Sequence, residues 1–378
     1  MKGIEEKQIE APYELPEGWT WVKQNEVCKL TDGEKLSGIE YPYLEVKYLR
    51  GTKEKVFQSS GKFVIKGTKV ILVDGENSGE VFSVPEDGFM GSTFKALSIQ
   101  NVNEKYLQLF ITTKKDLYRN NKKGSAIPHL NKELFFNMPF PLPPTLAEQQ
   151  RIVNRIESMF VKLDEAKEKA QNVVDGFETR KAAILHNAFT GELTAKWRKE
   201  NGESDDSWVE KRFDEFCLLK RGFDLPATQR IEGMYPLVSS SGIIDTHNEA
   251  KVKAPGIVTG RSGSIGKVFY IEEDFFPLNT TLYSQNLFGN NARYVYYYLS
   301  NFDFKSFSSS TAVPTLNRNN FSKVELKVPT LPEQVEIVRI LDIIIEKENK
   351  AKQAAETVLE QIDLLKKSIL ALAFRGEL

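Results

Sequence analysis

The sequence predicts an α+β protein in which two globular, strand-rich domains are separated by a long antiparallel two-helix coiled coil. Three observations lead to this prediction. First, 378 residues are too many for one core, because single cores stop growing at about 250–300 residues. Second, residues 144–193 match residues 329–378 without a gap at 20 of 50 positions. Third, the segments outside this repeat hold short β-branched and aromatic runs between turn residues.

Both copies of the repeat are expected to be helices of about 43 residues, or roughly 65 Å. Each copy opens on a proline that excludes an upstream helix. Thr145 and Thr330 can then cap the first turn, with Glu148 and Glu333 completing a capping box. Between residues 147 and 190 and between residues 333 and 375, Gly176 is the only Gly or Pro, and it weakens the first helix.

Apolar side chains recur three or four residues apart along both helices, which is typical of a coiled-coil seam. Glu348 interrupts this seam. Two such stripes in one chain most simply bury each other as an antiparallel pair with an approximate two-fold axis; the alternative is that each stripe packs on a different protein. The expected interface residues are Val153, Ile156, Phe160, Leu163, Val173, Phe177, Val338, Leu341, Ile345, Val358, Ile362 and Leu365.

The repeat divides the chain into alternating segments. Unlike the helices, the two domains have diverged widely from one another. The expected organisation is a first domain at 1–143, a first helix at 144–193, a polar connector at 194–206, a second domain at 207–328 and a second helix at 329–378.

Composition excludes several classes of protein. The 51 basic and 52 acidic residues balance, so any nucleic acid must be held by local clusters. Two cysteines and three histidines argue against a disulfide framework and a multi-ligand zinc site, and we expect Cys28 and Cys217 to be small buried side chains. The sequence has neither a long apolar run nor an amino-terminal signal pattern, so we expect a cytoplasmic protein.

Catalytic motifs are incomplete. The loop from Gly260 to Val268 resembles a phosphate-binding loop, but Arg261 and Val268 stand where that motif requires Gly and Ser or Thr. Asp32 with Glu45 and Lys47 sketches the core of a metal-dependent nuclease, which stays a minor alternative because the other half of the chain lacks an equivalent. We therefore expect no catalytic site and no metal site.

Two basic clusters are better candidates for function. Residues 47–69 hold seven Lys or Arg against one acid, and residues 251–267 hold four against none. Such side chains neutralise phosphates, and arginine in a groove can read guanine; an ordinary solvated face is the alternative. The candidate DNA-contact residues are Lys47, Arg50, Lys53, Lys55, Lys66, Lys69, Arg221, Lys251, Lys253, Arg261, Ser262, Ser264 and Lys267.

The whole pattern resembles the specificity subunit of type I restriction–modification systems. The most specific parts of the resemblance are Pro141–Val153, Pro329–Val338, Ala188–Leu193 and Ala373–Leu378. It implies that each domain is a target recognition domain reading one half of a bipartite DNA site. It also implies that the paired helices set the spacer between the half-sites and dock the modification subunits.

The resemblance further implies which partners this chain works with. These are double-stranded DNA, two modification subunits that use S-adenosylmethionine, and ATP-dependent restriction subunits. The chain itself would then be non-catalytic and hold no cofactor. The alternative from another class is a structural coiled-coil adaptor whose end domains bind proteins.

Overall fold

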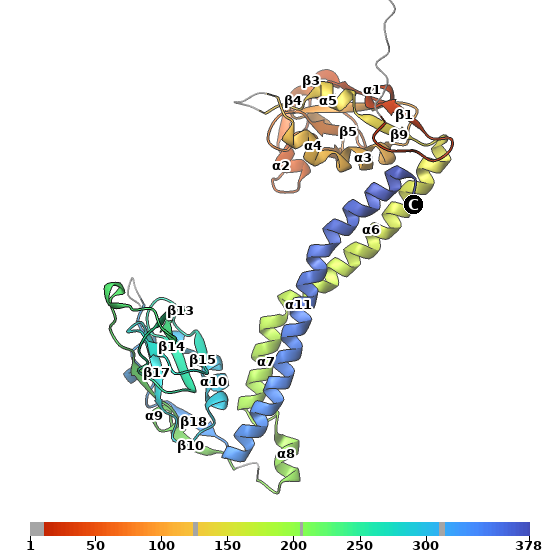
Figure 1. The fold of residues 1–378 in the computed structure, drawn as a ribbon. Helices are drawn as coiled ribbons and strands as arrows, with labels where there is room; N and C mark the ends of the chain where they lie inside the picture. Colours follow the sequence, from red (N-terminus) through yellow and green to blue (C-terminus); the bar gives the residue numbers. More distant parts are fainter. Residues whose placement is uncertain (1–10, 124–127, 205–206, 310–313) are drawn as a thin grey trace, which may run out of the picture. The chain divides into compact units, whose positions relative to one another are not determined.

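A computed structural model describes residues 11–123, 128–204, 207–309 and 314–378 (Figure 1). The ends of the expected first domain and connector, residues 1–10 and 205–206, lie outside this part. Contacts divide the chain into two compact units, Met1–Ala170 with Thr357–Leu378 and Gln171–Glu356. Each unit therefore combines one strand-rich domain with a part of both helical segments. No helix in the described part is long and apolar enough to cross a membrane.

The first unit contains a four-stranded sheet, a small barrel and a two-stranded sheet, with the predicted mixture of strands and helices. Strands β2, β8, β5 and β6 form an antiparallel sheet in that order, β3, β4 and β7 close into a barrel, and β1 pairs with β9. The elements are β1 (Thr20–Lys23), α1 (Gln24–Val27), β2 (Cys28–Thr31), β3 (Glu34–Leu44), α2 (Val46–Leu49), β4 (Phe57–Val64), β5 (Lys69–Leu72), β6 (Val81–Ser83), β7 (Gly88–Met90), β8 (Phe94–Ile99), α3 (Glu104–Thr113), α4 (Lys115–Asn120), α5 (Lys132–Phe136) and β9 (Pro139–Leu142).

The second unit repeats this plan with different side chains. Strands β11, β17, β14 and β15 form a four-stranded antiparallel sheet, β13, β12 and β16 form a three-stranded sheet, and β10 pairs with β18. The elements are β10 (Val209–Arg212), α9 (Phe213–Phe216), β11 (Leu218–Arg221), η1 (Ala227–Gln229), β12 (Tyr235–Ser239), β13 (Gly242–His247), β14 (Gly256–Gly260), β15 (Val268–Ile271), β16 (Phe276–Pro277), β17 (Thr281–Asn286), α10 (Ala292–Asn301), η2 (Phe304–Phe307), η3 (Arg318–Asn320) and β18 (Glu325–Val328).

The first helical segment breaks at Gly176, whereas the second is continuous. The elements are α6 (Leu146–Asp175), α7 (Phe177–Phe189) and α11 (Leu331–Arg375). At the break, the Arg180 guanidinium donates to the Val173 carbonyl at 2.9 Å and to the Glu348 carboxylate at 2.8 Å. A Cβ at position 176 would lie 2.4 Å from that guanidinium. Glycine therefore leaves room for Arg180, and Glu348 interrupts the apolar seam because it is the partner of Arg180.

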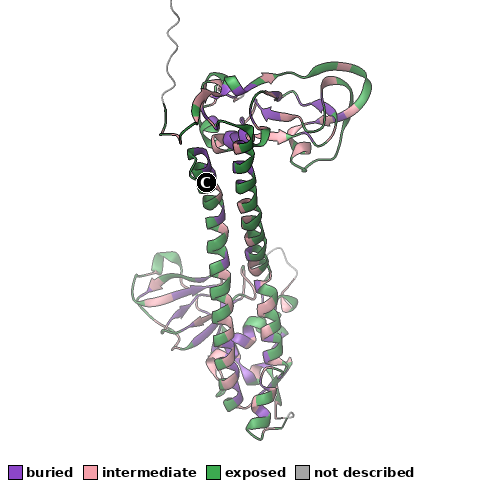
Figure 2. Ribbon diagram, turned by 90° about the vertical axis from the view of Figure 1, so that its right-hand side faces the viewer, coloured by how far each residue is buried: buried purple, intermediate pink, exposed green. Residues whose placement is uncertain are grey.

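The helices contact each other within each unit. In the first unit, Ile156 of α6 shares a buried cluster with Ala373 and Phe374 of α11. In the second unit, Leu185 of α7 shares a cluster with Leu341 of α11. Over much of their length these helices have an exposed outer face (Figure 2).

Two predicted seam residues are wrong. Val358 and Leu365 are 39% and 48% exposed, and the less exposed positions near them are Leu359 and Lys366. The less exposed positions of this stretch are 348, 352, 355, 359, 362 and 366, in alternating steps of four and three, so Ile362 was predicted correctly while Val358 and Leu365 each lie one position too early. Of the other predicted residues, the buried ones are Val153, Ile156, Phe177, Leu341 and Ile362, and the half-buried ones are Phe160, Leu163, Val173, Val338 and Ile345.

A buried glutamine fastens each domain to the start of a helix. In the first unit, the Gln149 side chain accepts a hydrogen bond from the backbone N–H of Asn103 at 2.7 Å. In the second, Gln334 accepts from the N–H of Asn291 at 2.9 Å. Asn103 and Asn291 in turn cap α3 and α10 with their own side chains. The same hydrogen bond therefore occurs twice, once in each unit.

The predicted capping boxes are wrong in both helices. Thr145 caps the first helix, since its hydroxyl accepts from the Glu148 N–H at 3.1 Å, but the Glu148 carboxylate binds Arg151 at 2.8 Å. In the second helix, the Glu333 carboxylate is fully buried and accepts from Arg198 at 2.6 Å and from Trp208 at 2.9 Å.

The polar connector is packed rather than extended. It contains the short helix α8 (Ala195–Glu200), and the Arg198 side chain is only 7% exposed. The Thr194 hydroxyl also donates to Glu333, at 2.6 Å. The sequence did not predict that the connector is packed, because an arginine buried beside a carboxylate cannot be told from a solvated arginine by its sequence alone.

We expect Glu333→Ala to lower the free energy of unfolding by about 3–5 kcal/mol, because it leaves the buried Arg198 without its carboxylate. Glu336→Ala is the matched control on the same helix. Its partner Arg339 is 61% exposed, so the pair contributes at most about 1 kcal/mol. Urea denaturation measures both variants. Equal, small losses would contradict the importance of the buried pair.

Candidate nucleic-acid interface

The basic run of the first domain is largely neutralised by acids from other segments. Most of these acids lie on loops distant in sequence, which is why the count along residues 47–69 overstated the charge. These pairs lie at the surface, so each contributes little to stability. The ion pairs are Arg50–Glu80, Lys53–Glu45, Lys55–Glu86 and Lys62–Asp32.

The remaining candidates of the first domain are dispersed. Lys47 and Lys66 are exposed, and no ion pair to either occurs among the described residues. Lys69 donates to the Ser83 hydroxyl at 3.0 Å. The loop between Arg50 and Phe57 is exposed throughout, so it is accessible to a long ligand.

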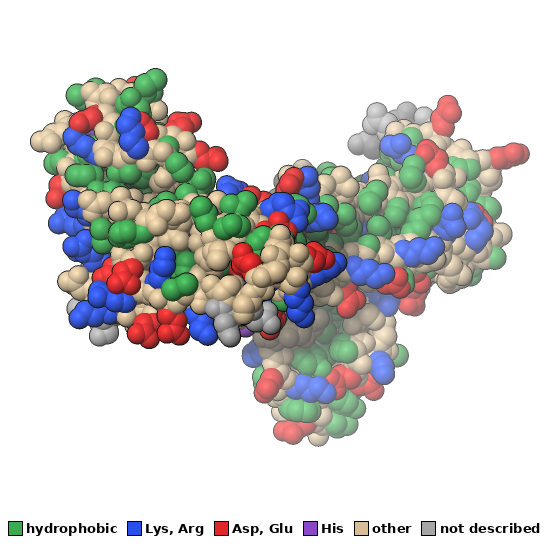
Figure 3. Space-filling model, turned by 90° about the horizontal axis from the view of Figure 1, so that it is seen from below, with side chains coloured by type: hydrophobic (Ala, Val, Ile, Leu, Met, Phe, Trp, Pro, Cys, Tyr) green, Lys and Arg blue, Asp and Glu red, His purple; other side chains and the backbone are tan. Residues whose placement is uncertain are grey.

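Several candidates of the second domain are also paired. Lys251 binds Glu249, Lys253 binds Asp274 at 2.7 Å, and Arg221 binds Asp224 at 3.0 Å. The Lys253 ammonium lowers the pKa of the Asp274 carboxyl through its hydrogen bond. On the face drawn in Figure 3, basic and acidic side chains of the described residues are intermixed, and no continuous basic stripe is visible.

A concentration of positive charge lies along a groove of about 560 Å³ in the second domain, where Arg221 pairs with Asp224 outside the lining. Four cationic side chains line it and no acid does, among the described residues. It lies where β11, β14 and β17 end or begin. The cationic lining residues are Lys220, Arg221, Arg261 and Arg318.

Backbone hydrogen bonds hold the groove's arginines on rigid elements. The Arg261 N–H donates to the Thr280 carbonyl at 2.8 Å, and the Arg261 carbonyl accepts from Leu316 at 2.7 Å. The Arg318 guanidinium donates to the Leu219 carbonyl at 3.2 Å. Ser262 pairs with Thr315 in an isolated β-bridge beside them. The loop of Ser264 and Lys267 follows, where Gly260 donates to the Lys267 carbonyl.

Of the groove's cations, Arg221 and Arg261 were among the residues predicted from the sequence, whereas Lys220 and Arg318 were not. Arg318 directly follows the Pro-Thr-Leu-Asn motif, at the position corresponding to Lys132 in the first domain, so a basic residue at equivalent positions was a usable signal. Lys220 carried no signal of its own, because the groove forms only when strands distant in sequence come together.

The two carboxylates on which the nuclease alternative depends are both paired with lysines. Asp32 accepts hydrogen bonds from Lys62 and Lys95, which lower its pKa to about 2, and Glu45 binds Lys53. Among the described residues, no group of three or more His, Cys, Asp or Glu could hold a metal ion. The arrangement is that of a charged surface rather than a metal site.

The two cysteines are buried in the cores of their domains. Cys28 and Cys217 are at most 1% exposed, and burial raises the pKa of each thiol to about 12. They are therefore protonated at neutral pH and serve as small apolar side chains, as the sequence predicted.

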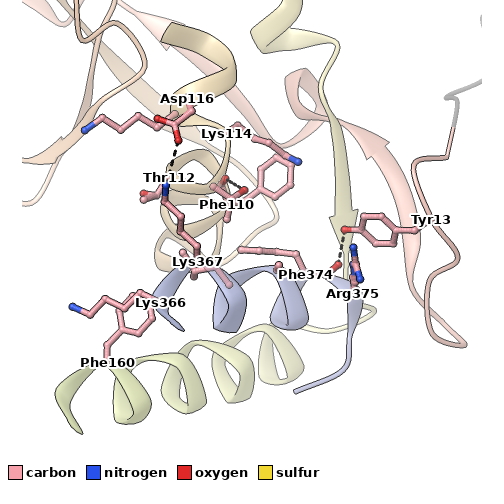
Figure 4. A pocket seen from close by; sticks show the side chains of 14 residues that line it. Tyr13, Phe110, Thr112, Lys114, Asp116, Phe160, Lys366, Lys367, Phe374 and Arg375 are labelled. Atoms are coloured by element: carbon pink, nitrogen blue, oxygen red, sulfur yellow. Dashed lines mark hydrogen bonds and ion pairs between the residues drawn. The ribbon is translucent and has the colours of Figure 1, made fainter. Parts of the chain in front are cut away.

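A second kind of surface lies where the first domain meets the helices (Figure 4). It is a pocket of about 530 Å³ between the end of α3, Phe160 of α6 and the last turns of α11. Its floor is apolar and its rim cationic: Lys366 lies over the Phe160 ring, and Lys114 over the Phe110 ring. Burial lowers the pKa of Lys114.

The second unit has an equivalent pocket of about 590 Å³ between α10, α7 and α11. Positions in the two pockets correspond through the sequence repeat, since Ile345 replaces Phe160, Lys181 replaces Lys366 and Leu185 replaces Leu370. The helix repeat therefore builds the same type of pocket in each unit.

A family model and several known proteins match this chain. The model of the type I restriction modification DNA specificity domain matches the chain twice, over residues 16–174 and 205–361. The type I restriction enzyme MjaVIII specificity subunit of Methanocaldococcus jannaschii is 30% identical over 224 residues, which cover 55% of this chain and 51% of that relative. The type I restriction enzyme EcoDI specificity subunit of Escherichia coli is 23% identical over 420 residues, covering 96% and 89%.

Solved structures share the fold at lower sequence identity. The HsdS subunit from Thermoanaerobacter tengcongensis is 18% identical, with a TM-score of 0.68 over 98% of this chain and 100% of that one. A chain from a structural study of assembly and conformational transition in a type I R-M system is also 18% identical, with a TM-score of 0.75 over 97% and 100%. Since the family model covers most of both domains, this chain belongs to the type I restriction modification DNA specificity family.

Proposed function

We propose that this chain supplies the DNA sequence specificity of a type I restriction–modification complex, with each domain reading one half of a bipartite site. The observation that carries this proposal is that one DNA specificity model matches twice, once on each of two unlike domains. The groove with three arginines in the second domain supports it. The adaptor alternative is not favoured, because it explains neither the family nor the groove.

The paired helices set the distance between the half-sites in this proposal. Within each unit, α11 packs against the first helical segment, and α11 runs unbroken for 45 residues from one unit into the other. An unbroken helix of that length spans about 68 Å. A rigid antiparallel pair with an approximate two-fold axis converts such a length into a fixed spacer on DNA, whose half-sites recur about 34 Å apart per helical turn.

The two equivalent pockets are the docking sites for two modification subunits. Both pockets offer apolar side chains to a partner, and the cationic rim of the first suits a protein segment that places apolar side chains between acidic ones. S-adenosylmethionine and ATP belong to the modification and restriction subunits of the complex, and this chain recognises DNA without catalysing the reaction.

The direct test assembles the chain with its modification subunits and measures binding to bipartite duplexes. We expect selective binding at one spacer length and at least about tenfold weaker binding when the spacer changes by one base pair. Affinity should fall as salt rises. Binding that ignores both half-site sequence and spacer would reject the proposal, and an excess of unrelated duplex serves as the control.

Deleting one heptad from both helices, residues 166–172 and 357–363 outside both pockets, tests the spacer. Removing seven residues shortens a helix by about 10.5 Å, or roughly three base pairs of B-DNA. We expect the preferred spacer to shorten by about three base pairs while both half-site sequences persist. The selected spacer is measured by sequencing bound duplexes from a spacer library. An unchanged spacer in a folded variant would contradict the proposal that the paired helices set the spacer.

Ala371→Glu tests the first pocket. Ala371 is exposed on α11 and lines the pocket, so a glutamate there obstructs it and repels an acidic partner segment. We expect the complex to retain one modification subunit instead of two, as measured by light scattering of the purified complex. Ala354→Glu, exposed on α11 outside both pockets, is the control and should retain two. Two subunits in both variants would exclude this docking site.

A further inference from the structure

Backbone positions that line the groove in the second domain have counterparts in the first. In the second domain, Leu282 of β17 pairs with Arg221 of β11 and with Thr259 of β14. In the first domain, Lys95 of β8 pairs with Ile71 of β5, so Lys95 corresponds to Leu282 and Ile71 to Thr259. The hydrogen bond from Leu316 to the Arg261 carbonyl recurs as one from Leu130 to the Val73 carbonyl, both at 2.7 Å. Two separate sets of backbone hydrogen bonds therefore align the domains residue by residue.

A third set fixes the positions next to the groove. The Arg261 N–H bonds to the Thr280 carbonyl at 2.8 Å, and the Val73 N–H to the Thr93 carbonyl at 2.9 Å. The isolated bridge of Ser262 with Thr315 recurs as a bridge of Asp74 with His129. These equivalences come from the backbone alone, so they hold although the side chains differ.

At these equivalent positions the side chains differ in hydrogen-bonding character. Arg261 corresponds to Val73, and Arg221 corresponds to Asp32 through the alignment of β11 with β2. At the isolated bridge, the second domain has two hydroxyl side chains, Ser262 and Thr315, where the first domain has the carboxylate of Asp74 and the imidazole of His129. Asp74 and His129 lie 2.7 Å apart, with side chains 33% and 53% exposed. The second domain therefore presents a guanidinium at position 261, where the first has the buried Val73, and the first domain presents a carboxylate at position 74, where the second has a hydroxyl.

We propose that side chains at and next to this bridge read bases: Arg261, which precedes Ser262, reads a guanine in one half-site, and Asp74, which corresponds to Ser262, reads an exocyclic amino group of cytosine or adenine in the other. Guanine offers two acceptors in the major groove, which match the two-donor edge of an arginine. Cytosine and adenine offer an amino donor, which matches a carboxylate. His129 is a positioning residue, because its contact with Asp74 holds that carboxylate.

The basic residues around these positions do not carry the sequence preference. Arg318 and Lys132 are both cationic at equivalent positions, so they suit phosphate, which is present in both half-sites. The inference rests on the proposed DNA-recognition function and adds to it which positions discriminate. It also explains how one backbone plan reads two different half-sites.

The experiment selects duplexes from a library with both half-sites randomised and the spacer fixed, using the complete complex with modification subunits. For Arg261→Ala and Arg261→Lys we expect a preference for guanine to relax by about 5- to 150-fold at one position of one half-site only. Lysine keeps the charge but loses the fork of donors, so Arg261→Lys should lower specificity while leaving the salt dependence unchanged.

Asp74→Asn should change the base preference at one position of the other half-site. The base for which the preference is lost shows whether Asp74 reads cytosine or adenine. Lys327→Ala, exposed on β18 outside the groove, is the control and should leave every position unchanged. Retained spacer preference shows that each variant is folded.

The outcomes separate this inference from the function on which it rests. If the complex that contains the unsubstituted chain selects no bipartite site, the proposed function fails. If it selects one and the Arg261 and Asp74 variants keep every preference, the assignment of these positions is overturned. If Arg261→Ala weakens all sequences equally and lowers the salt dependence, Arg261 contacts phosphate only, which also overturns it.

Discussion

The hydrogen bonds that fasten each domain to a helix are the constraint on which the rest of the structure depends. Gln149 and Gln334 are at most 2% exposed and accept from the backbone at the start of α3 and α10. A buried amide left without its partner costs about 1–3 kcal/mol, so neither domain can swing away from its helix cheaply. The proposed spacer role requires each domain to keep its orientation on its helix, and these two bonds favour that orientation.

The two helix starts share that bond and differ in the rest. Glu148 pairs with Arg151 at the surface, whereas its counterpart Glu333 is buried with Arg198 and Trp208. The difference follows from chain connectivity: α8 follows the first helical segment directly and brings Arg198 to the start of the second helix. In the described residues of the first unit, no such segment supplies a buried arginine to Glu148.

Sequence reasoning succeeded where one local rule decides the structure. The helices could be predicted because a 50-residue stretch with regular apolar spacing and almost no Gly or Pro has few alternatives. The seam failed at Val358 and Leu365, because lysines occupy inward positions of α11: Lys352 lies over the Phe177 ring and Lys366 over the Phe160 ring, which a search for apolar spacing does not reveal. The role of Gly176 as the space for Arg180 could not be predicted, since it depends on a side chain from the neighbouring turn and on Glu348 of another helix.

The candidate site was predicted only in part, for an electrostatic reason. Charge counted along residues 47–69 ignored Glu80 and Glu86, which the fold places beside Arg50 and Lys55. Surface pairs of this kind are weak, so phosphate can replace the carboxylates, but the net attraction to DNA stays small. A chain of formal net charge −1 therefore has little non-specific affinity of its own. Selectivity must come from a few well-placed side chains and from partners that hold the DNA, which is how a recognition subunit can discriminate between sequences without binding every duplex.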